Sequence, residues 1–338
     1  MPERMRLMNK TECVKAALAH VPCDKVPYAI NLTCEYYQTY GEQLLKEYAS
    51  EKIRKDYEEG RFGIGEAFSL AIGNYMVCVC PPWWGWDNVP DYFSEEDTPE
   101  DFPHAIGTGS YDKFFEEIKY IKENYDVYML VTIWGSHFEK AYFCRGIENF
   151  LADLAADPDW CDALLERIIQ KNLVMLENIS NSPYIDGILL GSDWGSQNDL
   201  LMSPDVWRKL IKDRERREYE LIRSYGKNVF VHSCGNIERI LPDLVELKLE
   251  GLNPVQPECM NLENIKNTYG SALTFWGGIS TQRTLPYGTP EEVRQEASRV
   301  IRMMSQNGGY ITAPSQEIQI DVPYDNLKAL IATAKEFG

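Results

Sequence analysis

A histidine and a cysteine stand two residues apart at the end of a short apolar run, VFVHSCGN (229–236). Alternate side chains of an extended chain share one face, so His232 and Cys234 are expected to point the same way. Imidazole and thiolate are both favoured ligands of zinc. Because the run stops at these residues and a Gly-Asn break follows, the pattern predicts a reaction centre at the carboxyl end of a strand.

A third ligand could come from the next apolar run, which is followed by Cys259. Neighbouring strands lie only about 4.8 Å apart, so His232, Cys234 and Cys259 could converge and leave a fourth position open, as catalytic zinc requires. The alternative is a histidine that bonds a backbone carbonyl beside a buried thiol. Substitute or fourth ligands in the metal interpretation are Glu35, Glu258 and Glu317.

Asp193 lies in a glycine-punctuated loop, GSDWGSQ (191–197), after another apolar run. One interpretation is a carboxylate that caps the loop through backbone N–H groups. The other places Asp193 in the site, where it holds a substrate group or orients His232, with Gln197 as an amide partner. Glu35, which follows the first predicted strand, is a further candidate for a catalytic carboxylate.

Most of the tryptophans fall at predicted strand ends or in the loops after them, namely Trp83, Trp84, Trp86, Trp134, Trp194 and Trp276. Several aromatic rings around one site predict a dry pocket for an apolar, aromatic or quaternary-ammonium ligand. Loop tryptophans can also fill an interface, and a homodimer is compatible with them. Trp160 and Trp207 fit helix faces and are expected in the core. The remaining candidate substrate-binding residues are Gln197, Asn236, Gln256 and Gln316.

The elements that position these residues alternate between short apolar runs and amphipathic helices. The runs cover 26–30, 76–79, 127–132, 187–190, 228–231, 251–255, 273–276 and 309–312. Asp157, Ser203 and Thr289 each precede a proline and acidic residues, which predicts three helix starts. The alternation predicts an α/β fold, a (β/α)8 TIM barrel in a single domain over 1–338 with a helical N-terminal extension over 1–25. No G-x-G-x-x-G segment supports a doubly wound sheet.

Composition narrows the class of protein and its partners. The chain has 338 residues and a formal net charge of −18, which argues against nucleic acid and disfavours a polyanionic substrate. Nine cysteines form an odd set without a repeating framework, as expected of a reducing compartment. No apolar run approaches the roughly 20 residues that cross a bilayer, and the start lacks the features of a signal peptide. We therefore expect a cytoplasmic protein without a membrane partner.

From Asp186 onward the chain resembles the uroporphyrinogen decarboxylase superfamily, especially its methyltransferase-like branch in anaerobic corrinoid metabolism. The segments that carry the resemblance are GILLGSDWGSQ, SPDVW, GKNVFVHSCGNIERILPDLVE, LNPVQPE, LTFWGGISTQ, LPYGTPEEV and GGYITAPS…DVPYDNLKAL. They cover nearly half of the chain in the order that the family has them. The resemblance implies a (β/α)8 barrel, in agreement with the pattern of the strands and helices.

This chain departs from each of the two branches of that family at one segment. The decarboxylases carry an Arg-rich N-terminal motif that grips a substrate with many carboxylates, whereas VPYAINLTCE (26–35) has no arginine. The methyltransferase branch shares H-x-C with His232 and Cys234, but its third zinc ligand is a cysteine in an A-P-G-C-like segment. The matching segment here is APSQE (313–317), so Cys259, Gln316 or Glu317 must supply the third ligand, or the metal is absent.

The resemblance, together with the H-x-C pair, implies a methyltransferase that moves a methyl group between a small methylated substrate, or a thiol or folate-type acceptor, and a corrinoid. Zinc would stabilise the negative charge on the heteroatom. The methylcorrinoid would sit on a separate protein, because the chain has no cobalamin-binding D-x-H-x-x-G segment. Three alternatives stay open: a decarboxylase or lyase of the same fold acting on a small non-porphyrin substrate, a metal-independent methyltransferase that uses carboxylates and His137, and a non-catalytic ligand-binding barrel.

Overall fold

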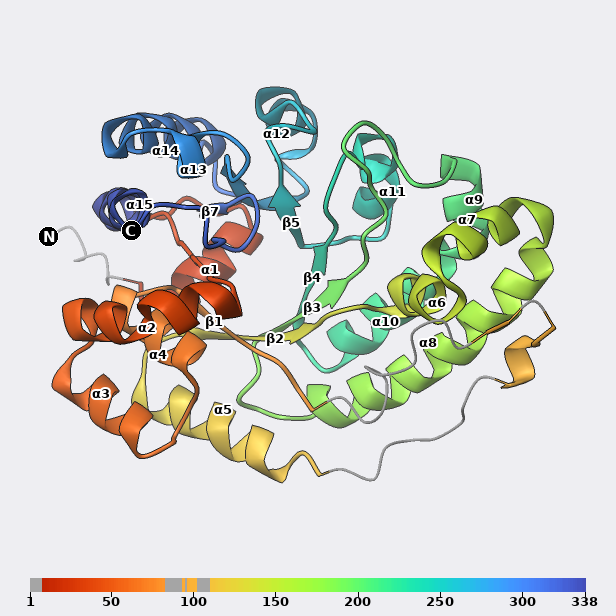
Figure 1. Cartoon of the computed structure of the whole chain (residues 1–338), viewed down its shortest axis with the longest axis horizontal. Coiled ribbons are helices and arrows are strands. Elements are labelled where there is room, and N and C mark those ends of the chain that lie inside the picture. Colours follow the sequence, from red (N-terminus) through yellow and green to blue (C-terminus); the bar gives the residue numbers. More distant parts are fainter. Residues whose placement is uncertain (1–7, 83–92, 95, 102–109) are drawn as a thin grey trace, which may run out of the picture. The chain divides into compact units, whose positions relative to one another are not determined.

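The computed structural model describes residues 8–82, 93–94, 96–101 and 110–338, and the described residues alternate between strands and helices (Figure 1). Within the described residues, the strands of each part of the sheet follow one another in the same order as in the chain. The chain divides into two compact units. Unit 1 comprises the described parts of Met1–Cys78, Glu117–Met129 and Glu250–Gly338, and unit 2 those of Val79–Glu116 and Leu130–Leu249.

Unit 1 contains three consecutive parallel strands, β5 (Gly251–Val255), β6 (Thr274–Ile279) and β7 (Tyr310–Pro314). Every residue of these strands is buried, as expected of a parallel sheet whose two faces are both covered. β1 (Met76–Val79) begins in this unit. Its helices are α1 (Lys10–Leu18), α2 (Cys34–Tyr48), α3 (Glu51–Glu58), α4 (Ile64–Ile72), part of α5 (Asp112–Asn124), α12 (Leu262–Tyr269), α13 (Thr284–Tyr287), α14 (Pro290–Met304) and α15 (Tyr324–Phe337).

The predicted first strand, residues 26–30, is not a strand in the structure but occupies a strand position. Tyr28 forms an isolated parallel bridge with Thr312 of β7, and its carbonyl accepts the N–H of Tyr75 at 2.8 Å, immediately before β1. Two physical causes prevent a continuous ladder. Pro27 has no N–H to donate. The side chain of Asn74, rather than backbone, bonds the N–H and carbonyl of Ile30, at 3.1 and 3.0 Å.

Unit 2 contains β3 (Gly187–Gly191) and β4 (Asn228–His232), with most of β2 (Tyr128–Ile133) beside them. All neighbours are parallel, so the residues that follow each strand emerge at the same edge. The helices that flank these strands are α6 (His137–Arg145), α7 (Ile147–Ala156), α8 (Pro158–Ser180), α9 (Pro204–Leu210), α10 (Lys212–Ser224) and α11 (Leu241–Glu246). No described helix is long and apolar enough to cross a bilayer.

The predicted helix starts are confirmed. Asp157, Ser203 and Thr289 are the N-caps of α8, α9 and α14, and each side chain accepts a backbone N–H of the first turn. Thr289 makes a full capping box, because Glu292 also accepts the backbone N–H of Thr289, at 2.7 Å. Trp207, expected in the core, is fully buried.

We predict that Thr289→Ala lowers the free energy of unfolding by about 1 kcal/mol, since α14 loses a side-chain partner for a first-turn N–H group. The measurement is urea unfolding followed by circular dichroism. Ser298→Ala, in the interior of α14, is the matched control and should cost nothing, because alanine is the better helix former. Equal effects of the two substitutions would contradict the assigned cap.

Candidate functional site

The carboxyl ends of β3 and β4 bring Asp193, His232 and Cys234 together within unit 2. Gly191 pairs with His232 in the register of the two strands, and the N–H of Ser192 donates to the carbonyl of His232 at 2.8 Å. His232 Nε2 lies 3.4 Å from Cys234 Sγ and 3.8 Å from Asp193 Oδ1. His232 and Cys234 therefore face one point, and Asp193 joins them.

Two glycines explain how the loops after β3 and β4 can approach so closely. Gly235 has φ +83°, and a Cβ there would lie 2.5 Å from the carbonyl carbon of Gly195. A Cβ on Gly195 would lie 2.6 Å from the carbonyl oxygen of Cys234. A hydrogen bond also joins the two loops, since the N–H of Asn236 donates to Ser196 O at 2.8 Å. The glycines of both sequence motifs are thus required by the contact between the two loops.

Asp193 is oriented by the backbone of the neighbouring loop. Its Oδ1 accepts the N–H of Cys234 at 2.8 Å, so the carboxylate both holds the loop and reaches the imidazole of His232. The two interpretations of Asp193 left open by the sequence are therefore not exclusive. About a third of the Asp193 side chain, 36%, is exposed, whereas that of His232 is 8% exposed. The three side chains are thus fixed from within the protein and open to solvent on one side.

The donor set fits a zinc ion. The three residues offer one nitrogen, one sulfur and one oxygen atom, all within 4.8 Å of one another. Tetrahedral zinc with bonds of about 2.0 to 2.3 Å needs ligand atoms roughly 3.3 to 3.8 Å apart, which is the range found around His232 Nε2. Three protein ligands would leave a fourth position for substrate, as in catalytic zinc sites.

Glu139 and Tyr142, one turn apart on α6, lie beside this cluster and were not among the predicted site residues. The hydroxyl of Tyr142 donates to Glu139 Oε1 at 3.2 Å. Burial, together with the nearby charge of Asp193, raises the pKa of Glu139 to about 7. No motif marks these residues in the sequence. The one signal is their position in the helix that follows the strand end at Trp134. Residues three apart in a helix share a face, and this face of α6 is directed toward the site.

Trp134 lies against the imidazole of His232. The two rings are 4.8 Å apart between centroids and meet edge to face at 85°. Although it touches His232, the indole is 39% exposed. Trp134 is therefore placed to shield one side of His232 from water while it remains accessible to a ligand.

Other predicted site residues of unit 2 have different positions. Trp194 has no exposed surface and packs against Trp207 at 5.3 Å, so its ring is part of the core in this structure. Asn236 stabilises the loops, since its Nδ2 donates to Asn198 O at 3.2 Å and its Oδ1 accepts the N–H of Glu238 at 3.1 Å. Gln197 is exposed in the loop after β3. Trp83, Trp84 and Trp86 lie outside the described residues.

The remaining candidates lie in unit 1. Cys259 is half-buried, with its Sγ 3.8 Å from Gln256 Oε1, and burial raises the pKa of its thiol. Trp276 is 3% exposed and its indole N–H donates to Ala29 O at 3.4 Å. Glu35 is exposed in the first turn of α2. Ser280 donates its hydroxyl to Glu258, and burial raises the pKa of Glu317.

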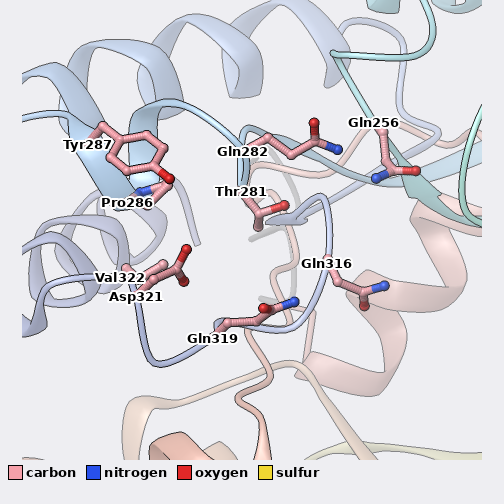
Figure 2. Close-up of a pocket in the computed structure, with 9 residues that line it drawn as sticks. All are labelled: Gln256, Thr281, Gln282, Pro286, Tyr287, Gln316, Gln319, Asp321 and Val322. Atoms are coloured by element: carbon pink, nitrogen blue, oxygen red, sulfur yellow. The ribbon is translucent and has the colours of Figure 1, made fainter. Parts of the chain in front are cut away.

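Unit 1 has its own pocket, of about 400 Å³, formed by the segments that follow β5, β6 and β7 (Figure 2). Its lining is rich in amide groups and consists of Gln256, Thr281, Gln282, Pro286, Tyr287, Gln316, Gln319, Asp321 and Val322. Among the described residues that line it there is no lysine or arginine, and Asp321 adds a negative charge. Such a lining suits neutral hydrogen-bonding groups and disfavours a polycarboxylate.

A solved structure of a methyltransferase from Methanosarcina mazei shares this fold, with a TM-score of 0.72. The match covers 98% of this chain and 99% of that one, at 20% sequence identity. It confirms the α/β fold of the TIM-barrel kind that the sequence predicts. At this identity the likeness concerns the fold alone.

Two curated relatives are both described as methylcobamide:CoM methyltransferase MtaA. One, from Methanosarcina barkeri, is 28% identical over 137 residues, and the other, from the Fusaro strain of that species, is 27% identical. The match covers 40% of this chain and 38% of theirs, so the chain matches about two fifths of the length of these relatives.

The family itself follows from a longer match. Residues 90–337, well over half of the chain, match the family described as uroporphyrinogen decarboxylase (URO-D). This range includes all of β2 to β7, the cluster of Asp193, His232 and Cys234, and the pocket of unit 1. The chain belongs to the uroporphyrinogen decarboxylase family.

Proposed function

We propose that the protein is a corrinoid-dependent methyltransferase with a zinc ion held by Asp193, His232 and Cys234. It would move a methyl group between a corrinoid on a separate protein and a thiol or another small heteroatom substrate. The observation that carries the proposal is the convergence of imidazole, thiol and carboxylate at the ends of β3 and β4. The names of the curated relatives support the kind of reaction.

Each protein group would have a definite task in this reaction. Bound zinc would supply Lewis acidity, which lowers the pKa of a thiol or another heteroatom at the open position. Asp193 keeps the ligands in place through its bond to the N–H of Cys234. Trp134 shields His232 on one side. Glu139, which is buried near the charge of Asp193, would take up the proton that the acceptor releases.

The atoms balance in either direction. With a thiol acceptor, the sulfur forms a bond to the methyl carbon while the carbon–cobalt bond breaks, its electron pair stays on the corrinoid, and the thiol proton goes to Glu139. In the reverse direction, the corrinoid takes the methyl group and Glu139 returns a proton to the heteroatom.

The decarboxylase alternative has weaker support from this chain's residues. A carboxylate substrate calls for cationic partners, and the described lining of the unit 1 pocket has none. The metal-independent alternative required His137 at the site, but its side chain has no exposed surface and faces two glutamates instead.

We predict that purified protein contains stoichiometric zinc and that Cys234→Ser and Asp193→Asn each lower zinc affinity more than tenfold, because each removes an anionic ligand. The measurement is metal analysis, followed by competition with a chromophoric chelator. Cys259→Ser is the matched control for loss of a thiol and should keep its zinc. Zinc that is lost in Cys259→Ser and kept in Asp193→Asn would show that the third ligand is Cys259.

We predict that the protein transfers a methyl group from methylcobalamin to a small thiol. The measurement is the decrease in the absorbance of the methyl–cobalt species with time. Cys234→Ser should slow it at least about 100-fold, since most of the activation of the thiol depends on the metal. The Cys259→Ser protein is again the control. Release of carbon dioxide from carboxylate substrates without corrinoid, at a rate unaffected by Cys234→Ser, would support the decarboxylase alternative instead.

A further inference from the structure

A second cluster of titratable groups lies inside unit 2 and has no part in the chemistry described above. It consists of His137, at the start of α6, and Glu215 and Glu218, on α10. All three side chains have no exposed surface. Glu215 and Glu218 are three residues apart on the helix and so share a face. Two buried carboxylates are costly unless protons, cations or hydrogen bonds compensate them.

The imidazole of His137 stands between the two carboxylates. Its Nε2 lies 3.5 Å from Glu215 Oε1, and its Nδ1 lies 3.3 Å from Glu218 Oε2. The two nitrogens of an imidazole point away from each other, so each faces a different carboxyl group. An imidazole nitrogen can donate to a carboxylate or accept from a protonated carboxyl group, so each contact is favourable when a proton lies between the two groups. Burial also raises the pKa of Glu215 to about 7, which favours a proton in this cluster.

Each carboxylate also accepts a hydroxyl from one of the loops that carry the candidate site. Ser136 Oγ donates to Glu218, 3.2 Å from each carboxylate oxygen, and Asn172 Nδ2 donates to Glu218 Oε1 at 3.0 Å. Ser192 Oγ donates to Glu215 Oε1 at 3.4 Å. Ser136 lies two residues after Trp134, and Ser192 immediately precedes Asp193.

The same two serines connect the strand ends through their backbone. The N–H of Ser136 donates to Gly191 O at 2.8 Å, and the N–H of Ser192 donates to His232 O, also at 2.8 Å. Side chain and backbone of each serine thus join different elements. The serines link the loops after β2 and β3 to α10 on one side and to the site on the other.

We propose that His137, Glu215 and Glu218 are positioning residues, which hold the loops of Ser136 and Ser192 so that Trp134 and Asp193 keep their places beside His232. They act through the serines and touch neither substrate nor metal. The inference concerns the arrangement of Trp134 and Asp193. It rests on the proposed function only in so far as Asp193 is read as a zinc ligand.

The main test is the fluorescence of Trp134 in metal-free protein, taken as the difference between each variant and the same variant with Trp134→Phe. Imidazole contact quenches indole emission, so His232→Leu defines the fully unquenched signal. We expect Glu218→Gln, and the milder Ser136→Ala, to recover at least half of that increase. Glu166→Gln is the control, since Glu166 pairs with Arg214 and Arg217, side chains of α10 that are in neither loop. It should leave the signal unchanged.

A second readout covers the loop of Asp193. Ser192→Ala should weaken zinc binding about tenfold, as expected when a group that orients a ligand is lost, without changing the ligands themselves. Ser196→Ala, in the same loop, is its control, because Ser196 bonds Asp199 and contacts neither glutamate.

Three results would overturn the proposal. The first is a Trp134 signal that is unchanged in both Glu218→Gln and Ser136→Ala. The second is an equal effect of Glu166→Gln. The third is a second equivalent of metal that Cys234→Ser keeps and Glu218→Gln loses, which would make the cluster a metal site. None of these depends on methyl transfer, and the fluorescence test does not require zinc, so failure of the proposed function would be recognised separately.

Discussion

The register of β3 against β4 is the constraint on which the candidate site depends. Gly191 pairs with His232, so the loops that follow start level with each other and Asp193 meets His232 and Cys234. Side chains in a strand alternate between two faces, and a slip of one residue would turn His232 away from this point. Both strands are completely apolar between their end residues. A shifted register would therefore gain no buried polar contact that could offset the loss of the contacts at the strand ends.

The contact between site residues that lie close together in the sequence could be predicted, and the contacts that tertiary packing makes could not. His232 and Cys234 are two residues apart, so the alternation of a strand was enough to place them together. Asp193 could be identified as a strand-end carboxylate, but its contact with Cys234 depends on the glycines that let two loops touch. Glu139 had only its spacing after Trp134 as a signal, and this was not enough, because its position near the site depends on how α6 packs.

The same reasoning applies to the fold. The apolar runs predicted the described strands to within three residues at each end, because burial on both faces leaves a continuous apolar signal. Residues 26–30 have a comparable composition and do not form a continuous strand, since Pro27 and the side chain of Asn74 replace ladder bonds. Trp194 shows the limit for side chains. Its place after a strand predicted a ring that lines a substrate pocket, whereas in the structure the ring is buried against Trp207 of α9.

The charge of the proposed centre offers an argument for an aspartate as third ligand. Asp193 and a thiolate at Cys234 would together balance the charge of a divalent zinc, and two thiolates would do the same, so the net charge is equal for aspartate and for cysteine as third ligand. Carboxylate oxygen donates less electron density than thiolate sulfur, and zinc with this set would be the stronger Lewis acid. It would lower the pKa of a bound thiol further, at the expense of the thiolate's nucleophilicity. The chain has a net charge of −18, and Glu139 is buried near the charge of Asp193. A cation held by Asp193 would stabilise this arrangement, because it would offset the repulsion between the two carboxylates.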